Sequence, residues 1–239
     1  MPRKAKKIKE APLVDLNQIT LKDKNFYVID GVAYPRCTWI LSYYPKGEGL
    51  NRWMGGQASY EAAQEAMHKA GDRGTKVHQA IQDLIAGQSL MYQDFPEDQW
   101  AMISSFVQWC KDFNPKFLAN EQLVYSKEYS YACTFDSLVE IGNQKYIVDF
   151  KTSGALYPSY NCQVAAYIQA YLEMNKDFKE TLVPALLRLG TKHRKGYEFV
   201  TKPTWEDDFQ TFIAVKHIFE AENPDLKPKI KTINKTLAL

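Results

Sequence analysis

The sequence has little cysteine, and none of it is arranged as a zinc or disulfide framework. Its 239 residues contain four cysteines, Cys37, Cys110, Cys133 and Cys162, and no two of them form a CxxC pair. Widely spaced single cysteines are typical of buried thiols in a reducing compartment. The sequence therefore favours a cytoplasmic protein over a secreted, disulfide-linked one.

Long hydrophobic runs are also missing. No stretch approaches the roughly 20 apolar residues that a membrane-spanning helix requires, and the basic start is not followed by the apolar segment of a secretory signal. We therefore expect no membrane association. The start is rich in lysine rather than in arginine and serine, so a mitochondrial matrix location is less favoured than the cytoplasm.

The net charge is only +2, so the distribution of charge says more than its sum. Basic residues cluster at 3–9, at 188–195 and at 227–235. Solvated chain ends explain the first and third clusters equally well, whereas a structured turn would hold the charges of the second near a polyanion. The candidate nucleic-acid contacts in that cluster are Arg188, Lys192, Arg194 and Lys195.

The most informative stretch is a predicted β-hairpin over 131–151. Two β-rich runs flank Gly142-Asn143, and this dipeptide is a two-residue hairpin signal. Counting outward from that turn places Asp136 opposite Asp149, and Lys151 shares a face with both because residues two apart on a strand point the same way. A register slip of one residue would turn Asp136 to the other face.

Two carboxylates facing each other on a sheet repel, and burial penalises their charge. A divalent cation such as Mg²⁺ would remove the conflict, because it prefers carboxylate oxygens and often also binds a substrate phosphate. The alternative is a solvated Asp-Lys pair near a strand end. Spacing alone leaves both interpretations open.

The surrounding pattern predicts an α/β fold. Strand 145–151, helix 159–174 and strand 182–189 form a βαβ unit, whose strands should be parallel and whose crossover should be right-handed. This gives a central mixed sheet flanked by helices on both faces. Composition further predicts two helices, over 59–69 and 75–86, separated by 71–75, and a capping box of Thr204 with Asp207 before the last helix.

Several motifs together resemble a known nuclease family. In chain order they are Gly74-Thr75-Lys76-Val77-His78, Glu121, Thr134-Phe135-Asp136, Asp149-Phe150-Lys151-Thr152, and Gln163 with Ala166-Tyr167. This succession resembles the RecB-like branch of the PD-(D/E)XK nuclease superfamily. Within that branch, the chain is similar to phage-type and mitochondrial genome maintenance exonucleases. The resemblance implies a restriction-endonuclease-like core, preceded here by an N-terminal helical region.

The same resemblance implies roles for these residues. His78, Asp136 and Asp149 would ligate the metal together with the backbone carbonyl of Phe150, and Lys151 would be the catalytic lysine. Gln163 and Tyr167 match the helical motif that positions the active site and the backbone phosphates, and Glu121 matches a further acidic position with a catalytic role. The chain departs from the family at Cys133-Thr134, where a glycine usually precedes the aspartate motif.

The resemblance also implies a domain organisation. We expect a flexible basic arm over 1–24, a single nuclease domain over 25–225 and a basic tail over 226–239. Within the domain, a hairpin and helical cap would span 25–95, the catalytic core 96–203 and a final helix 204–222.

The implied function is a DNA exonuclease that uses one or two Mg²⁺ or Mn²⁺ ions. It would act on single-stranded DNA or DNA ends in replication, recombination or repair, in the cytoplasm of a bacterium or a phage-infected cell, with replication or recombination proteins as candidate partners. No cysteine follows Cys162, so we predict no [4Fe-4S] cluster. The alternatives are an endonuclease of the same fold and a non-catalytic nucleic-acid-binding member.

Overall fold

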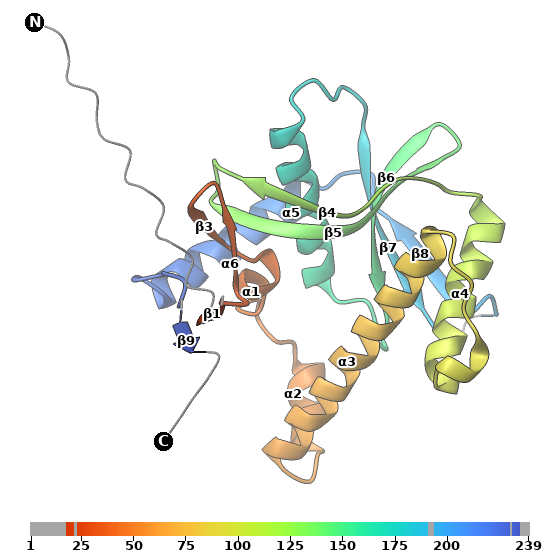
Figure 1. The fold of residues 1–239 in the computed structure, drawn as a ribbon, viewed down its shortest axis with the longest axis horizontal. Helices are drawn as coiled ribbons and strands as arrows, with labels where there is room; N and C mark the ends of the chain where they lie inside the picture. The colour runs from red at the N-terminus through yellow and green to blue at the C-terminus, as the bar shows by residue number, and fades with distance from the viewer. Residues whose placement is uncertain (1–17, 22, 191–193, 230, 235–239) are drawn as a thin grey trace, which may run out of the picture.

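The computed structural model describes residues 18–21, 23–190, 194–229 and 231–234 (Figure 1). The basic segment 1–17, Lys192 and the end of the tail lie outside these ranges. The helices are α1 (Cys37–Leu41), α2 (Glu48–Gly55), α3 (Tyr60–Ile85), α4 (Glu97–Phe113), α5 (Pro158–Met174) and α6 (Glu206–Glu222), with a 3-10 turn at Tyr92–Asp94. The strands are β1 (Gln18–Leu21), β2 (Phe26–Ile29), β3 (Val32–Pro35), β4 (Lys116–Ser126), β5 (Tyr131–Ile141), β6 (Gln144–Lys151), β7 (Leu182–Leu189), β8 (Tyr197–Thr201) and β9 (Lys231–Asn234).

A five-stranded mixed sheet, in the order β4-β5-β6-β7-β8, forms the centre of the fold. Strands β6 and β7 pair in parallel, and the other neighbours pair antiparallel. Helix α5 joins the parallel pair, which confirms the predicted βαβ unit and the α/β class. Two short antiparallel pairs, β2-β3 and β1-β9, lie outside this sheet.

Each face of the sheet has its own core. On one face, the buried side chains of α1, α5 and α6 pack with residues such as Phe135 and Ile147. On the other, α3 and α4 pack with Val148 and Phe150, around the fully buried Trp109. This is the layered arrangement by which a sheet buries both of its faces. The candidate site lies at one end of the β5-β6 pair, where α3 and α5 both approach the sheet.

The two helices predicted over 59–69 and 75–86 are one continuous helix, α3. Its N-cap is the predicted one, since Ser59 Oγ accepts a hydrogen bond from the Ala62 backbone N–H at 3.1 Å. The interruption predicted over 71–75 was therefore wrong. Gly71 and Gly74 each lower helix stability by roughly 1 kcal/mol, and the packing of the buried Val77 and Ile81 against the sheet offsets this cost.

Two further local predictions differ from the structure. The last helix, α6, begins at Glu206 with Trp205 as N-cap, and no side-chain bond caps it. Instead, the Glu206 carboxylate accepts a hydrogen bond from the Trp205 backbone N–H at 2.9 Å, so the capping box of Thr204 with Asp207 is not formed. The pairing of 18–21 with 231–234 was not predicted, because nothing local in either segment identifies the other as its partner.

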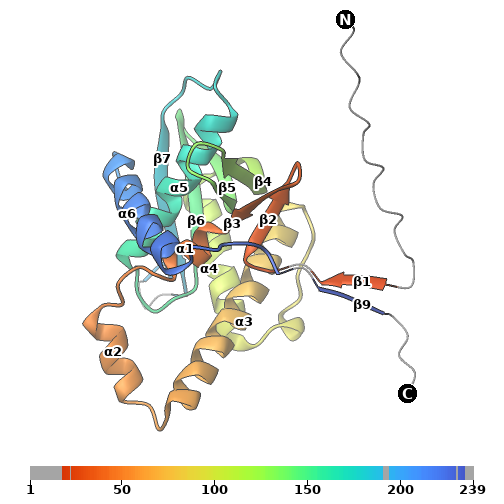
Figure 2. The same ribbon diagram turned by 90° about the vertical axis from the view of Figure 1, so that its left-hand side faces the viewer.

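Helix α2 and the N-terminal part of α3 project away from the sheet (Figure 2). No residue of α2 is buried. In the part of the chain that the structure describes, no helix is both long enough and apolar enough to cross a bilayer.

Candidate metal centre

The β5-β6 hairpin brings two acids together. Its observed register, with Ile141 opposite Gln144 and Ser137 opposite Val148, is the one predicted from the turn. Asp136 and Asp149 are the next residues outward on the two strands. Both are buried, with 8% and 2% of their surface exposed. Asp136 Oδ2 accepts a hydrogen bond from the Phe150 backbone N–H at 2.6 Å, which orients this carboxylate.

His78 of α3 and Glu121 of β4 complete a cluster around Asp136. One ligand atom from each of the three side chains lies within 4.8 Å of the other two. Nδ1 of His78 lies 3.4 Å from Asp136 Oδ1. Glu121 Oε1 accepts a hydrogen bond from Gln82 Nε2 at 3.2 Å, which ties the carboxylate to α3.

The backbone at Glu121 is unusual. Its φ is 46°, a left-handed conformation that costs a residue with a side chain roughly 1–2 kcal/mol. The residues on either side, Asn120 and Gln122, pair regularly with Ser137 and Phe135 of β5. Strained backbone of this kind is held only by its surroundings and clusters at functional sites.

The acids determine the protonation of His78. Burial disfavours a charged imidazole, but the attraction of the Asp136 carboxylate, its hydrogen bond and the more distant Asp149 outweigh it and raise the pKa of His78 to about 9. Burial, followed by repulsion from Asp136, raises the pKa of Glu121. At neutral pH the imidazolium therefore compensates part of the negative charge of the cluster.

Asp149 pairs with Lys151 beside this cluster. Lys151 Nζ lies 2.7 Å from Asp149 Oδ2, and this ion pair is the contact that the buried oxygen makes in the described structure. Burial, with repulsion from Asp136, raises the pKa of Asp149 to about 6 although the lysine lowers it. Burial disfavours the charged form of Lys151, but attraction to Asp149 outweighs it and raises the lysine pKa. Lys151 is therefore an ammonium ion at neutral pH.

Helix α5 holds this pair in place. Lys151 Nζ donates a hydrogen bond to Gln163 Oε1 at 2.9 Å and lies 4.2 Å from the ring centre of Tyr160. Gln163 Nε2 donates to the hydroxyl of Tyr167, one turn further along the helix, and that hydroxyl donates to Asp149 Oδ1 at 3.4 Å. Gln163 and Tyr167 therefore contact the lysine and the aspartate directly.

Apart from Glu121, the residues of this site line a cavity of about 290 Å³ between α3, α5 and the end of the hairpin. On the α3 side its wall is made of small residues, Ala70, Gly71 and Gly74, together with Arg73. A Cβ atom at Gly74 would lie 3.1 Å from Thr152 Oγ1, so the helix approaches the end of β6 closely at this point. Phe150, whose carbonyl the resemblance implies as a ligand, also lines the cavity.

The predicted basic contacts that the structure describes lie elsewhere, and Arg188 and Lys195 are paired with acids. Arg188 donates to Glu198 Oε2 through Nε and Nη2, at 2.9 and 2.6 Å, and to the Gly154 carbonyl at 2.7 Å. Lys195 Nζ lies 2.8 Å from Asp112 Oδ2. Arg194 lines a different cavity, between α4 and the start of β8. None of these three residues lines the 290 Å³ cavity.

Sequence analysis missed two residues of the site, Arg73 and Tyr160, which both line the cavity. Each lies close to a recognised motif. Arg73 immediately precedes the Gly74-to-His78 motif, and Tyr160 lies three residues before Gln163, on the same helical face. Helical spacing from the motif residues could have identified Tyr160, whereas the orientation of Arg73 depends on how α3 packs.

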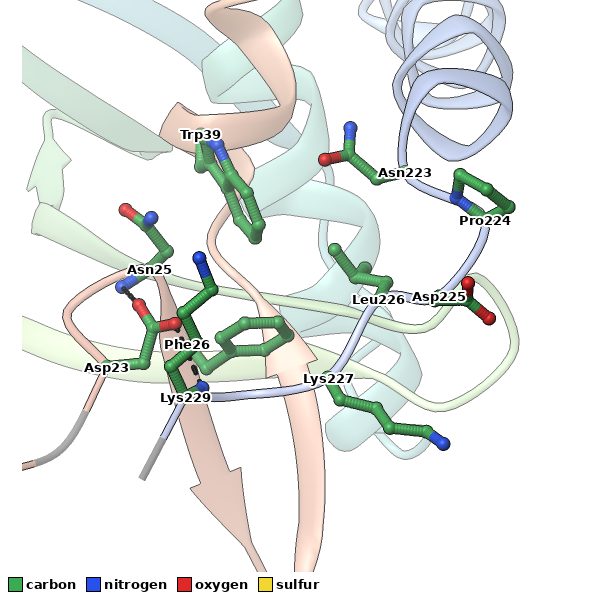
Figure 3. A pocket seen from close by; sticks show the side chains of 10 residues that line it. All are labelled: Asp23, Asn25, Phe26, Trp39, Asn223, Pro224, Asp225, Leu226, Lys227 and Lys229. Atoms are coloured by element: carbon green, nitrogen blue, oxygen red, sulfur yellow. Dashed lines mark hydrogen bonds between the residues drawn. The ribbon is translucent and has the colours of Figure 1, made fainter. Parts of the chain in front are cut away.

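A larger cavity, of about 560 Å³, lies between β2, α1 and the segment after α6 (Figure 3). It is lined by the rings of Phe26 and Trp39 and by the Asp23 carboxylate. That carboxylate already accepts hydrogen bonds from the backbone N–H groups of Asn25 and Lys229. The other acid that lines this cavity is Asp225, which is exposed, and no imidazole among the described residues lines it. The described lining therefore offers no cluster of ligands for a metal ion.

Comparison with protein families and with curated proteins finds no match. Among solved structures, the crystal structure of a candidate exonuclease from Eubacterium rectale is similar to this chain with a TM-score of 0.42 and 12% identity, over 66% of this chain and 69% of that one. The crystal structure of SSO0001 is similar with a TM-score of 0.34 and 12% identity, over 80% of this chain and 85% of that one. Likenesses this distant do not identify the chemistry of the site.

The donor set fits a divalent cation. Two carboxylates and an imidazole with ligand atoms within 4.8 Å of one another match the ligand types that divalent ions take. The buried carboxylate of Asp149, which forms an ion pair with Lys151, lies beside these ligands. The structure is thus compatible with a metal ion held by His78, Glu121 and Asp136, with Asp149 beside them.

Proposed function

We propose that this protein is a metal-dependent nuclease that hydrolyses DNA phosphodiester bonds, acting as an exonuclease on single-stranded DNA or DNA ends during replication, recombination or repair. The observation that supports this most is the placement of Lys151 and Asp149 beside His78 and Asp136 inside one cavity, with Glu121 completing the cluster around Asp136. Burying Asp136 and Asp149 together, with the Glu121 carboxylate beside them, is unfavourable unless cations compensate their charge. A metal ion and a catalytic ammonium group would both do so.

Asp136, His78 and Glu121 would hold Mg²⁺ or Mn²⁺, with Asp149 and the Phe150 carbonyl as further ligands. Such an ion polarises a phosphoryl oxygen and lowers the pKa of bound water. The imidazole nitrogen favours Mn²⁺ more than an all-oxygen site would.

Lys151 would act as a cation rather than as a base, because its raised pKa keeps the amine protonated. From its position beside Asp149 it would donate hydrogen bonds to the oxygens that gain charge as the nucleophile attacks phosphorus. Gln163 and Tyr160 would hold the ammonium group in that position, through the contacts that they already make with it. Tyr167 would hold Asp149.

The decisive experiment is degradation of a labelled single-stranded oligonucleotide with Mg²⁺ or Mn²⁺, compared with EDTA. Lys151→Ala should lower the rate by at least about a hundredfold, the usual effect of removing a transition-state donor. Asp149→Ala should lower the rate at least as much, because it removes a proposed metal ligand. Lys151→Ala should leave Mn²⁺ binding intact. Lys145→Ala is the matched control, because this lysine lies on the same strand but pairs with Glu180 outside the cavity. Full activity in both site variants would refute the assignment.

Closed circular single-stranded DNA separates the exonuclease from the endonuclease of the same fold. An exonuclease requires an end and leaves the circle intact, whereas an endonuclease opens it. Salt-dependent DNA binding without cleavage in either metal would instead support a non-catalytic nucleic-acid-binding protein.

A further inference from the structure

Arg73 lines the cavity, and the proposed chemistry leaves its hydrogen-bonding groups largely unused. It lies on α3, five residues before His78, and lines the same cavity as Lys151. A guanidinium group has five N–H donors in a fixed fork. In the described structure, its Nε is buried without a hydrogen-bond partner.

The contact that Arg73 does make is weak. Nη1 lies 3.4 Å from Oδ2 of Asp98, near the limit of a hydrogen bond, and the Asp98 side chain is 53% exposed. An exposed ion pair of this kind contributes little to stability. A buried donor without an acceptor, in contrast, carries a desolvation cost. The arrangement therefore favours an acceptor that comes from outside the chain.

The wall beside Arg73 leaves room for such an acceptor. Its neighbours on α3 that line the cavity are Ala70, Gly71 and Gly74, which have almost no side chain. The acids of the cavity would repel a polyanion. Arg73 adds a positive charge on the α3 side, in addition to Lys151 at the end of β6.

We propose that Arg73 binds the DNA substrate through a phosphate group, donating hydrogen bonds to non-bridging oxygens of a phosphate that enters the cavity. The planar fork of arginine matches two phosphate oxygens at once. This inference rests on the proposed nuclease function, because it takes DNA as the occupant of the cavity. In this arrangement Arg73 contacts the substrate and not the metal ion.

Binding can be tested separately from cleavage. The anisotropy of a labelled single-stranded oligonucleotide is measured across a salt series, in EDTA and again with Ca²⁺, for the wild-type protein and for Arg73→Ala. Loss of a charge-assisted hydrogen bond should weaken binding roughly tenfold to a hundredfold. Loss of one phosphate contact should also reduce the slope of log K against log salt by about 0.7.

Three variants separate phosphate binding from a role in the fold. Arg73→Lys keeps the charge but not the fork, so the salt slope should persist while part of the affinity is lost. Asp98→Asn removes the same ion pair from its other side and should bind DNA at least as tightly as the wild type. Lys69→Ala removes one charge from α3 outside the cavity, where Lys69 pairs with the exposed Glu65, and should change neither quantity.

Unchanged affinity and slope in Arg73→Ala would overturn the inference, and so would equal weakening in Arg73→Ala and Asp98→Asn. Absence of wild-type binding in both buffers would overturn it as well. Oligonucleotides with 5′-phosphate and 5′-hydroxyl ends show whether Arg73 binds a terminal or an internal phosphate. Either result supports the inference, provided that Arg73→Ala loses affinity for at least one of the two oligonucleotides. If the wild-type protein cleaves DNA but Arg73→Ala binds DNA as tightly as the wild type, only the inference about Arg73 is refuted. If binding depends on Arg73 but the wild-type protein does not cleave DNA, only the proposed nuclease function is refuted.

Discussion

Substitution of Asp136 by asparagine should release the proton that the acids hold on His78. In the wild-type protein the pKa of His78 is raised from 6.5 to about 9, against the effect of burial, and Asp136 is the strongest of the groups that raise it. The substitution keeps the shape of the side chain but removes its charge. Without that charge, burial should dominate, and the pKa of His78 should fall by more than one unit.

The magnitude follows from the linkage between titration and folding. A rise from 6.5 to about 9 corresponds to roughly 3 kcal/mol favouring the protonated ring, at 1.36 kcal/mol for each pKa unit. Because the folded pKa is above the unfolded one, this stabilisation is fully present below pH 6.5 and is lost as the pH rises through 9. A neutral imidazole is the metal ligand, so metal affinity should rise with pH over the same window.

The assay is an NMR titration of the histidine ring protons after dialysis against EDTA. The chain contains four histidines, and a His78→Gln variant identifies the resonance of His78. The wild-type resonance should titrate near pH 9 and move to lower pH in Asp136→Asn. Mn²⁺ affinity, measured by calorimetry from pH 6 to 9, should increase with pH. A wild-type His78 that titrates at pH 6.5 would refute this account of the electrostatics. A His78 pKa that is the same in the wild type and in Asp136→Asn would also refute it.

Three further changes test other parts of the structure. Glu121→Gln should weaken Mn²⁺ binding in calorimetry at least roughly tenfold, or about 1.4 kcal/mol, because it removes the charge of one of the two carboxylates in the cluster; equal affinity would exclude Glu121 from the metal site. Gly74→Leu should abolish oligonucleotide binding, because a Cβ at this position would already lie 3.1 Å from Thr152 Oγ1 and the leucine side chain would occupy part of the cavity; unimpaired binding by a variant that circular dichroism shows to be folded would contradict this use of the cavity. Trp109→Ala should cost about 3–5 kcal/mol in urea unfolding, because the ring is fully buried; a loss below about 1 kcal/mol would show that the core relaxes around the cavity.

The hairpin was predictable because its register is fixed locally. Gly142 adopts a φ of 62°, which glycine reaches without strain, and the two-residue turn then determines every pair outward from it. Counting residues was therefore sufficient to place Asp136 near Asp149. The parallel pairing of β6 with β7 followed from a general handedness rule and required no knowledge of the site.

The contribution of Glu121 to the cluster was not predictable from the residues. It depends on the pairing of β4 with β5, which are joined by a turn without a strong signature, and on a left-handed backbone at one position. No local sequence pattern predicts either of these two features. His78 is a similar case, because its approach to Asp136 is set by packing of α3 across the sheet, and its role came from the resemblance alone.

Charge clustering along the chain was the least informative signal. The cluster around 188–195 suggested a nucleic-acid contact, but Arg188 is paired with Glu198 on the neighbouring strand, and Lys195 with Asp112 on α4. A one-dimensional pattern shows which cations are close in sequence, not which acids will face them. Arg73 illustrates the converse, since it lines the cavity although it lies outside the three basic clusters of the sequence.

The acids of the site are held by contacts that a metal ion would not replace. Asp136 is oriented by the backbone N–H of Phe150, and Glu121 by the amide of Gln82, so neither carboxylate depends on the imidazolium of His78 for its position. A cation would take over the charge that the His78 proton supplies and leave those two hydrogen bonds in place. The carboxylates should therefore move little between the EDTA-treated and the Mn²⁺-bound protein, and binding the ion should principally exchange a proton for a metal.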